Sequence, residues 1–218
     1  MSYLDDVEFV TNPDPRCPCI LLLDTSGSMN GSPIIALNQG LQAFQSDLLQ
    51  DELAQRRVEI AIVTFGNGGV RPIQDFVTAD QFQTPFLLAD GDTPMGRAIE
   101  LAITMLRNRK DQYKANGIAY YRPWIFMITD GAPTDQWELA AQSLRTEESA
   151  GSLAFFAVGV EGANMQILSQ IAVRPPMMLQ GLQFVNLFLW LSRSQKRVSS
   201  GKVGQQTALP PIEGWAKV

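Results

Sequence analysis

Short apolar segments that alternate with helical patterns constrain the fold of this chain more than any other feature of its sequence. Buried strands appear as short apolar runs, and amphipathic helices appear as apolar residues at steps of three and four. Residues 34–48 follow the helical pattern, with Ile34, Leu37, Leu41, Phe44 and Leu48 on one face. The expected strands are CILLLD (19–24), VEIAIVTF (58–65), WIFMITD (124–130) and LAFFAVGV (153–160). This order predicts an α/β sheet with helices on both faces.

The segments between and after these strands complete the pattern. The glycine-rich GNGG predicts a tight turn into VRPIQDFV (70–77), and Pro72 restricts that segment to an edge of the sheet. Asp135 and Glu138, three residues apart, predict the start of another helix. Further helices are expected over 94–108, after Asn164 and near 182–195, with a last short strand at PMMLQ, 176–180.

Composition excludes several classes of function. The chain has 218 residues, a formal net charge of -5 and no histidine. Without histidine, Ser-His and Cys-His nucleophiles and the commonest zinc sites are excluded. The acidic balance argues against nucleic-acid binding, which needs a basic face. The basic residues late in the 94–108 helix are expected to form a solvated helix end; they are Arg107, Arg109, Lys110 and Lys114.

The sequence also predicts a cytoplasmic protein. The two cysteines, Cys17 and Cys19, are expected to be reduced thiols that point to opposite faces of the first strand. The acidic start, MSYLDDVEF, does not resemble a signal peptide. The apolar stretch LQFVNLFLWL has about half the length of a membrane span. We therefore do not expect an integral membrane protein.

Oxygen-bearing side chains follow the expected strands where those strands end. Asp24, Ser26 and Ser28 follow the first strand, Thr93 precedes the 94–108 helix, and Asp130 ends the strand 124–130. Ligands of open α/β sheets bind beyond the carboxyl ends of the strands. Carboxylates and hydroxyls are hard donors that suit Mg²⁺ or Mn²⁺, with Ca²⁺ less favoured, and disfavour zinc and copper. The pattern predicts a divalent-metal site.

The small number of carboxylates indicates how such a site would work. With only Asp24 and Asp130 as charged ligands, the bound ion keeps positive charge and an open position toward solvent. An Asp or Glu of a partner protein can then complete the metal shell. No general base or nucleophile is evident beside the site, so we expect a binding module and no enzyme.

These segments, DTSGS, the Thr of DTPMG and the Asp of ITDG, resemble the metal-ion-dependent adhesion site of von Willebrand factor A (VWA) domains. The resemblance covers residues 17–195, with 1–16 as an N-terminal extension and 196–218 as a flexible C-terminal tail. It implies a Rossmann-like, mostly parallel sheet of six strands with one antiparallel edge strand, VRPIQDFV, helices on both faces, and a role in protein–protein contact.

Within the superfamily, three segments are similar to the TerY-type proteins of bacterial tellurium-resistance and stress-response clusters. They are LLLDTSGSMNGSPIIALNQGL, ITDGAPTD and NLFLWLSRS. This resemblance implies partners among the other products of such clusters, peripheral membrane complexes included.

Two alternatives stay open from the sequence. In the first, the chain is a Mg²⁺-dependent phosphotransferase or phosphatase with Asp24 as nucleophile and Thr93 holding a phosphoryl oxygen. In the second, the metal serves stability only and has no open position. Neither the partner nor the oligomeric state follows from the sequence.

Overall fold

The computed structural model describes residues 8–66 and 68–217. Its strands are β1 (Cys17–Thr25), β2 (Val58–Gly66), β3 (Gly69–Thr78), β4 (Trp124–Thr129), β5 (Ala154–Gly159), β6 (Met177–Leu179) and β7 (Ala216–Lys217). Its helices are η1 (Gly27–Met29), α2 (Ser32–Leu48), α3 (Glu52–Arg57), α4 (Met95–Ala115), α5 (Glu138–Ser149), α6 (Met165–Ile171) and α7 (Phe184–Ser200).

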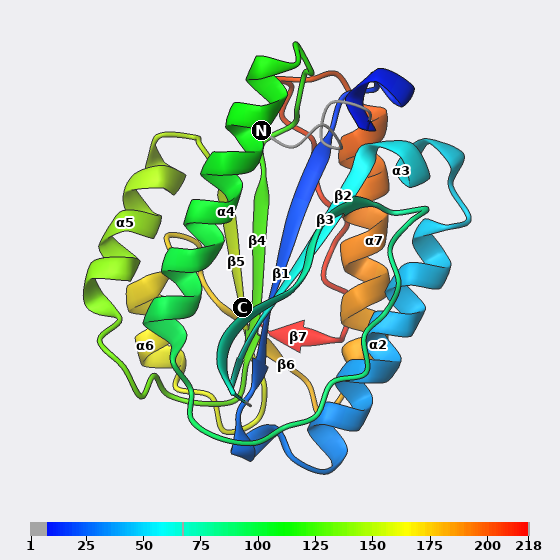
Figure 1. The fold of residues 1–218 in the computed structure, drawn as a ribbon. Coiled ribbons are helices and arrows are strands. Elements are labelled where there is room, and N and C mark those ends of the chain that lie inside the picture. The colour runs from blue at the N-terminus through cyan, green and yellow to red at the C-terminus, as the bar shows by residue number, and fades with distance from the viewer. Residues whose placement is uncertain (1–7, 67, 218) are drawn as a thin grey trace.

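The strands form one sheet in the order β3-β2-β1-β4-β5-β6-β7 (Figure 1). The five neighbouring strands β2, β1, β4, β5 and β6 pair in parallel. Strand β3 pairs antiparallel with β2 at one edge. The α/β class and the antiparallel edge strand with Pro72 are thereby confirmed. The sheet has seven strands, however, and the expected number of six is wrong, because β7 pairs antiparallel with β6 at the other edge.

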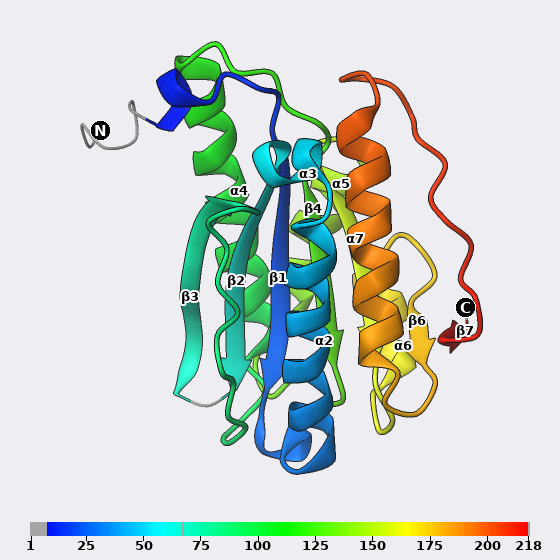
Figure 2. The same ribbon diagram turned by 90° about the vertical axis from the view of Figure 1, so that its right-hand side faces the viewer.

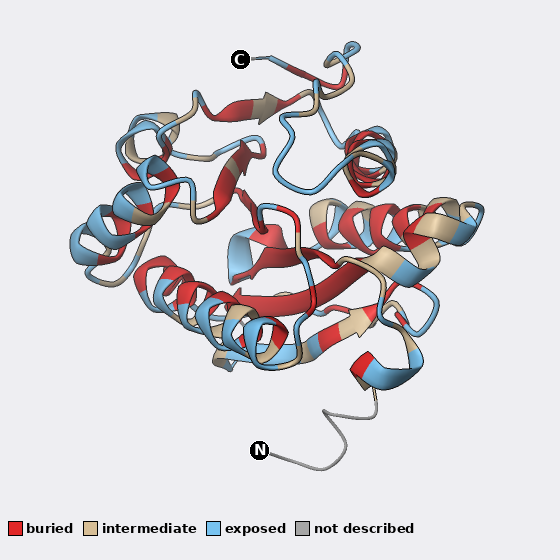
Figure 3. Ribbon diagram, turned by 90° about the horizontal axis from the view of Figure 1, so that it is seen from above, coloured by how far each residue is buried: buried red, intermediate tan, exposed pale blue. Residues whose placement is uncertain are grey.

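Helices cover both faces of the sheet, so that β1 is buried on each side. One core cluster joins Leu21 and Leu23 of β1 to α2 and α7, and the other joins Ile20 and Leu22 to α4 and α5. Figure 2 shows α2 and α7 together on one face, and Figure 3 shows buried strands surrounded by helices whose outer sides are exposed. The alternation of side chains along β1 explains why this strand is apolar throughout.

The two helices on the α2–α7 face approach each other closely at Gly40. A Cβ atom on that residue would lie 2.5 Å from the Phe188 side chain and 3.0 Å from the Cβ of Phe184. The apolar stripe predicted for residues 34–48 is confirmed, because its five members are all buried in the same core cluster. Helix α3 was not expected; Asp51 caps it by accepting a hydrogen bond from the backbone N–H of Ala54 (2.9 Å).

Cys17 and Cys19 are free, and both are buried in the core cluster that contains α2 and α7. The expectation that they point to opposite faces is wrong, because side chains two residues apart on a strand share a face.

The C-terminal residues expected to form a flexible tail are packed against the domain. Helix α7 continues to Ser200, and the chain then returns along it to β7 (Figure 2). Trp215 is 2% exposed, with its ring centroid 5.4 Å from that of Trp190, whose indole N–H donates to the carbonyl of Pro210 (2.9 Å). Burial of aromatic surface therefore holds a segment whose composition is polar.

A buried network of charges lies at the amino end of β1 and β2. Glu59 is fully buried and accepts hydrogen bonds from Nε (2.9 Å) and Nη2 (2.8 Å) of Arg109, while Arg16 pairs with it at 2.8 Å. The Tyr113 hydroxyl also donates to Glu59, and Glu8 pairs with Arg109 at 2.7 Å. The expectation of a solvated helix end is therefore wrong for Arg109, because Glu59 binds it inside the fold.

Among the described residues, no helix is long and apolar enough to cross a membrane.

Candidate metal centre

Three separate segments meet at the carboxyl edge of the sheet. β1 and β4 are parallel neighbours with Leu23 opposite Ile128, so Asp24 lies beside the end of β4. The loop before α4 is held to the end of β1 by two backbone hydrogen bonds, Asp90 N to Thr25 O and Gly27 N to Gly91 O, both 2.9 Å. The strand order and these bonds bring DTSGS, DT and TDG together.

Asp24 forms the floor of this site. It is fully buried, and its Oδ1 accepts a hydrogen bond from the backbone N–H of Ser26 (2.8 Å). Its Oδ2 accepts from the hydroxyl of Thr129 at 2.5 Å. Since an ionised carboxylate has about four lone-pair sites, Asp24 keeps acceptor capacity beyond these two bonds.

A chain of hydroxyl groups links the DTSGS segment to Asp130. The Ser26 and Ser28 hydroxyl oxygens lie 3.1 Å apart, and the Ser28 hydroxyl donates to Asp130 Oδ1 at 2.7 Å. Ser26 is 2% exposed and Asp130 7%, whereas Ser28 is exposed. The site is thus buried at Asp24 and open to solvent at Ser28.

Thr93 joins the same cluster from the loop before α4. A Cβ atom placed on Gly131 would lie 3.1 Å from the Thr93 hydroxyl oxygen and 3.7 Å from Asp24 Oδ2, so both oxygens lie over this glycine. Thr93 is 6% exposed, and its backbone exchanges hydrogen bonds with Thr134, whose hydroxyl accepts from Thr93 N (3.0 Å). The structure therefore brings all five predicted residues to one edge.

Asp135 holds the two loops of this edge together. The expected helix start at Asp135 and Glu138 differs from the structure, in which α5 begins at Glu138 and Asp135 binds another helix. Its carboxylate accepts from the backbone N–H groups of Gly96 (2.9 Å) and Arg97 (3.0 Å), at the N-terminus of α4. A Cβ on Gly96 would lie 2.3 Å from the carbonyl oxygen of Gln136, so only glycine permits this close approach.

Burial makes the ionised form of both aspartates costly. The pKa of Asp24 is raised to about 6, because burial and, to a smaller extent, the nearby Asp130 outweigh the hydrogen bonds from Ser26 and Thr129, which lower it. Burial also raises the pKa of Asp130, although the bond from Ser28 opposes this. Within residues 8–66 and 68–217, none of the ion pairs involves Asp24 or Asp130.

This donor set fits a hard divalent cation. It consists of two carboxylates and three hydroxyls, and a buried carboxylate without a cationic side chain is stabilised by an external positive charge. No group of three or more His, Cys, Asp or Glu residues with metal-site spacing occurs in the described part of the chain. With two carboxylates, three hydroxyls and neither thiolate nor imidazole, the chemistry of the candidate donors suits Mg²⁺ or Mn²⁺ better than zinc.

Thr129 is the site residue that sequence reasoning missed. Its hydroxyl binds Asp24 and also accepts from the backbone N–H of Gly131 (3.2 Å). Its role could have been inferred only from the pairing of the strands, because Thr129 lies beside Asp24 once β1 and β4 are paired in parallel.

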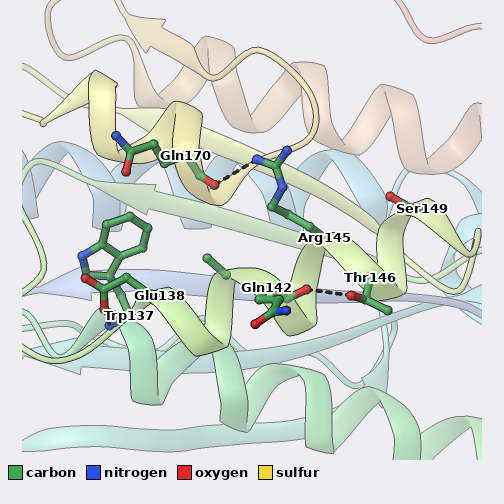
Figure 4. A pocket seen from close by; sticks show the side chains of 8 residues that line it. Trp137, Glu138, Gln142, Arg145, Thr146, Ser149 and Gln170 are labelled. Carbon is green, nitrogen blue, oxygen red and sulfur yellow. Dashed lines mark hydrogen bonds between the residues drawn. The ribbon is translucent and has the colours of Figure 1, made fainter.

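A separate pocket lies between α5 and α6 and contains none of the five site residues. Arg145 crosses it and donates to the carbonyl of Gln170 at 3.0 Å (Figure 4). Its lining includes Trp137, Gln142 and Thr146.

The model of the von Willebrand factor type A domain matches residues 19–184, which is most of the chain. The chain belongs to the VWA domain family. Members of this family act in metal-dependent protein–protein interaction or adhesion. No curated protein matches the chain.

Solved structures show the same VWA fold at low identity. The open form of the pilus adhesin SpaC from Lactobacillus rhamnosus GG has a TM-score of 0.66 and 15% identity, covering 85% of this chain and 31% of that chain. The SpRpn10 VWA domain gives 0.56 and 14%, covering 79% and 95%. Manganese-loaded TRAP protein of Plasmodium vivax gives 0.51 and 19%, covering 73% and 64%.

This VWA domain spans only about a third of the length of SpaC, and 47% of another similar structure, proximal thread matrix protein 1 from the mussel byssus.

Proposed function

We propose that this VWA domain is a non-catalytic, divalent-metal-dependent protein-binding module. The single observation that carries the proposal is the arrangement at the carboxyl edge, where Asp24 is buried without a cationic side chain beside hydroxyls that reach solvent at Ser28. The manganese-loaded TRAP structure supports a divalent ion in this fold. Mg²⁺ is the preferred ion, Mn²⁺ the second and Ca²⁺ the third.

Each residue has a distinct part in the proposed site. Asp24, Ser26, Ser28, Thr93 and Asp130 would hold the ion, and Thr129 orients Asp24 through its hydroxyl. The bound ion would supply residual positive charge at the solvent-facing side of the site. An Asp or Glu of a partner protein would complete the shell there.

The cellular setting follows from weaker observations. Two free, buried thiols favour a reducing compartment, and we therefore propose the cytoplasm. A role in bacterial tellurium resistance or stress response, and partners from such systems, rest only on the three segments that resemble TerY-type proteins. Deletion of the gene from its host should lower tellurite tolerance if that role is correct, and unchanged tolerance would remove it.

The phosphotransfer alternative is disfavoured by the surroundings of Asp24. An aspartyl-phosphate enzyme needs a general acid for the leaving group and positive charge for the phosphoryl oxygens beside its nucleophile. The residue two after Asp24 is Ser26, so no second acid stands there to act as general acid, and none of the ion pairs in the described part of the chain brings a lysine or arginine to Asp24.

The first test is calorimetric titration of chelator-treated protein with Mg²⁺ and Mn²⁺. The wild type should bind one ion, and Asp24→Asn should bind none. Asp92→Asn is the matched control, since it removes an equal charge from an exposed residue next to Thr93. Unaltered binding by Asp24→Asn would refute the proposed centre.

A second measurement separates a ligand-binding ion from a purely structural one. An open metal position holds an exchanging water, which enhances water-proton relaxation in the Mn²⁺ complex. A peptide with a central Glu should lower that enhancement by displacing the water, whereas the same peptide with Gln should not. No enhancement in the Mn²⁺ complex would identify a closed, structural metal.

A further inference from the structure

The loop before α4 carries exposed apolar side chains on a fixed backbone. Leu87 is 5% exposed, and both of its backbone groups bind the side chain of Asn38 on α2. Leu87 N donates to Asn38 Oδ1 at 2.8 Å, and Asn38 Nδ2 donates to Leu87 O at 2.9 Å. Asn38 Nδ2 also donates to the carbonyl of Ile34 (3.0 Å), which fixes its orientation.

This attachment turns the neighbours of Leu87 outward. In an extended segment, adjacent side chains point to opposite sides. Phe86 is accordingly 80% exposed and Leu88 62% exposed. On α2, Ile35 is 58% exposed and lies three residues before Asn38, and residues three apart are neighbours on a helix surface. We call Ile35, Phe86 and Leu88 the apolar rim.

The loop that carries Phe86 and Leu88 also runs to the candidate metal centre. Two residues after Leu88, Asp90 N binds the carbonyl of Thr25, and Gly91 O accepts from Gly27 N in the middle of DTSGS. The same loop then supplies Thr93. The rim and the site therefore belong to one surface, built from the ends of α2, β1 and this loop.

From this surface we infer the chemistry of the partner: a protein segment with one Asp or Glu that has an aliphatic or aromatic side chain within about two residues. The inference rests on the proposed function, since the carboxylate would reach the metal while the apolar side chain covers the rim. Single exposed apolar residues are common on protein surfaces. Several of them on a backbone that hydrogen bonds hold in place, beside a binding centre, indicate an interaction site.

The acidic residues of the loop before α4 limit the number of acidic residues that the partner segment can carry. Asp90 and Asp92 are exposed between the rim and Thr93. Because like charges repel, Asp90 and Asp92 disfavour a second acidic residue next to the partner's metal-binding carboxylate. The inferred segment thus has a single acid in an apolar setting, and an acidic run does not fit.

The experiment is selection from a displayed nonapeptide library with Glu fixed at the centre, in Mg²⁺ and in EDTA. The full chain should retain peptides only in Mg²⁺, with Leu, Ile, Val or Phe enriched and Asp or Glu depleted beside the central Glu. Synthetic copies of the enriched peptides should bind Phe86→Ser/Leu88→Ser at least about tenfold more weakly. The Mg²⁺ affinity of this variant should be unchanged.

Val10→Ser is the control, because Val10 is a comparably exposed apolar residue, 81%, in the segment before β1. Mg²⁺-dependent selection without apolar enrichment would overturn the inference and leave the proposed function standing. Equal selection in EDTA, or none in either buffer, would overturn the inference, and Mg²⁺ titration of the same sample tests the proposed function separately. Self-association that the double variant abolishes would assign the rim to a second copy and also overturn it.

Discussion

The two ends of the sheet differ in how a buried carboxylate is compensated. At the amino end, Glu59 is surrounded by Arg16, Arg109 and Tyr113, which neutralise it and fill its hydrogen-bonding sites. At the carboxyl end, Asp24 is equally buried, and among the residues that the structure describes its hydrogen bonds come from neutral groups, Ser26 and Thr129.

This difference separates a structural charge from a functional one. A buried charge is stable when an opposite charge and hydrogen bonds compensate for the lost water. The chain supplies that compensation to Glu59, whereas for Asp24 it supplies hydrogen bonds alone. The carboxyl end is therefore the end at which an external cation gains most.

The largest effect is expected from Glu59→Ala, which would leave Arg16 and Arg109 buried without their shared partner. We expect the free energy of unfolding to fall by about 3–5 kcal/mol, as when one member of a buried ion pair is removed. Urea denaturation monitored by circular dichroism measures it. Glu147→Ala is the control, because its pair with the exposed Arg107 should contribute less than about 1 kcal/mol. Equal losses in the two variants would contradict the comparison.

A smaller effect is expected from pH on the metal-free protein. With its pKa raised to about 6 from the usual 3.8, Asp24 holds a proton in the folded state when the unfolded chain has lost it. The free energy of unfolding should therefore decrease as pH rises from about 4 to 6 and level off above, by about 3 kcal/mol in total.

The difference between the wild type and Asp24→Asn in EDTA isolates this effect from other carboxyl groups. The variant lacks the buried charge and should be the more stable of the two at pH 7, although it should not bind metal. A difference that does not change between pH 4 and 7 would show that Asp24 titrates normally.

The smallest effect is expected from Asp135→Ala, at the same edge as Asp24. Its carboxylate is satisfied by the backbone of α4, so its loss should cost about 1 kcal/mol of stability, like the loss of a helix cap. The affinity for Mg²⁺, measured calorimetrically, should change far less than in Asp24→Asn. Loss of metal binding in Asp135→Ala would make Asp135 part of the centre.

The placement of the five candidate residues at one edge of the sheet could be predicted because their signals are local. Asp24 and Asp130 directly follow apolar runs that can only be buried strands, and parallel strands bring their carboxyl ends to one edge. Thr93 follows from the same logic, since it stands before a helix. None of these predictions required knowledge of which distant residues touch.

The largest features that sequence reasoning missed depend on distant contacts. Arg109 is buried because Glu59, fifty residues earlier, lies against α4. Trp215 is buried because Trp190 and Pro210 receive it, although its segment is rich in proline, glycine and glutamine. The last strand has two residues, too few to show any periodicity, and it exists only through β6.

The close approach at Gly96 has a mechanical consequence. Contact between Gly96 and Gln136, the bonds from α4 to Asp135, and the exchange between Thr93 and Thr134 fasten the start of α4 to the loop after β4. Thr93 and Asp130 are therefore held in one framework. The bonds that join Thr25 and Gly27 to the loop before α4, and Ser28 to Asp130, attach the DTSGS turn to the same framework. A cation that enters this site would meet oxygens already spaced by connected backbone, so that little ordering of the loops would be needed on binding.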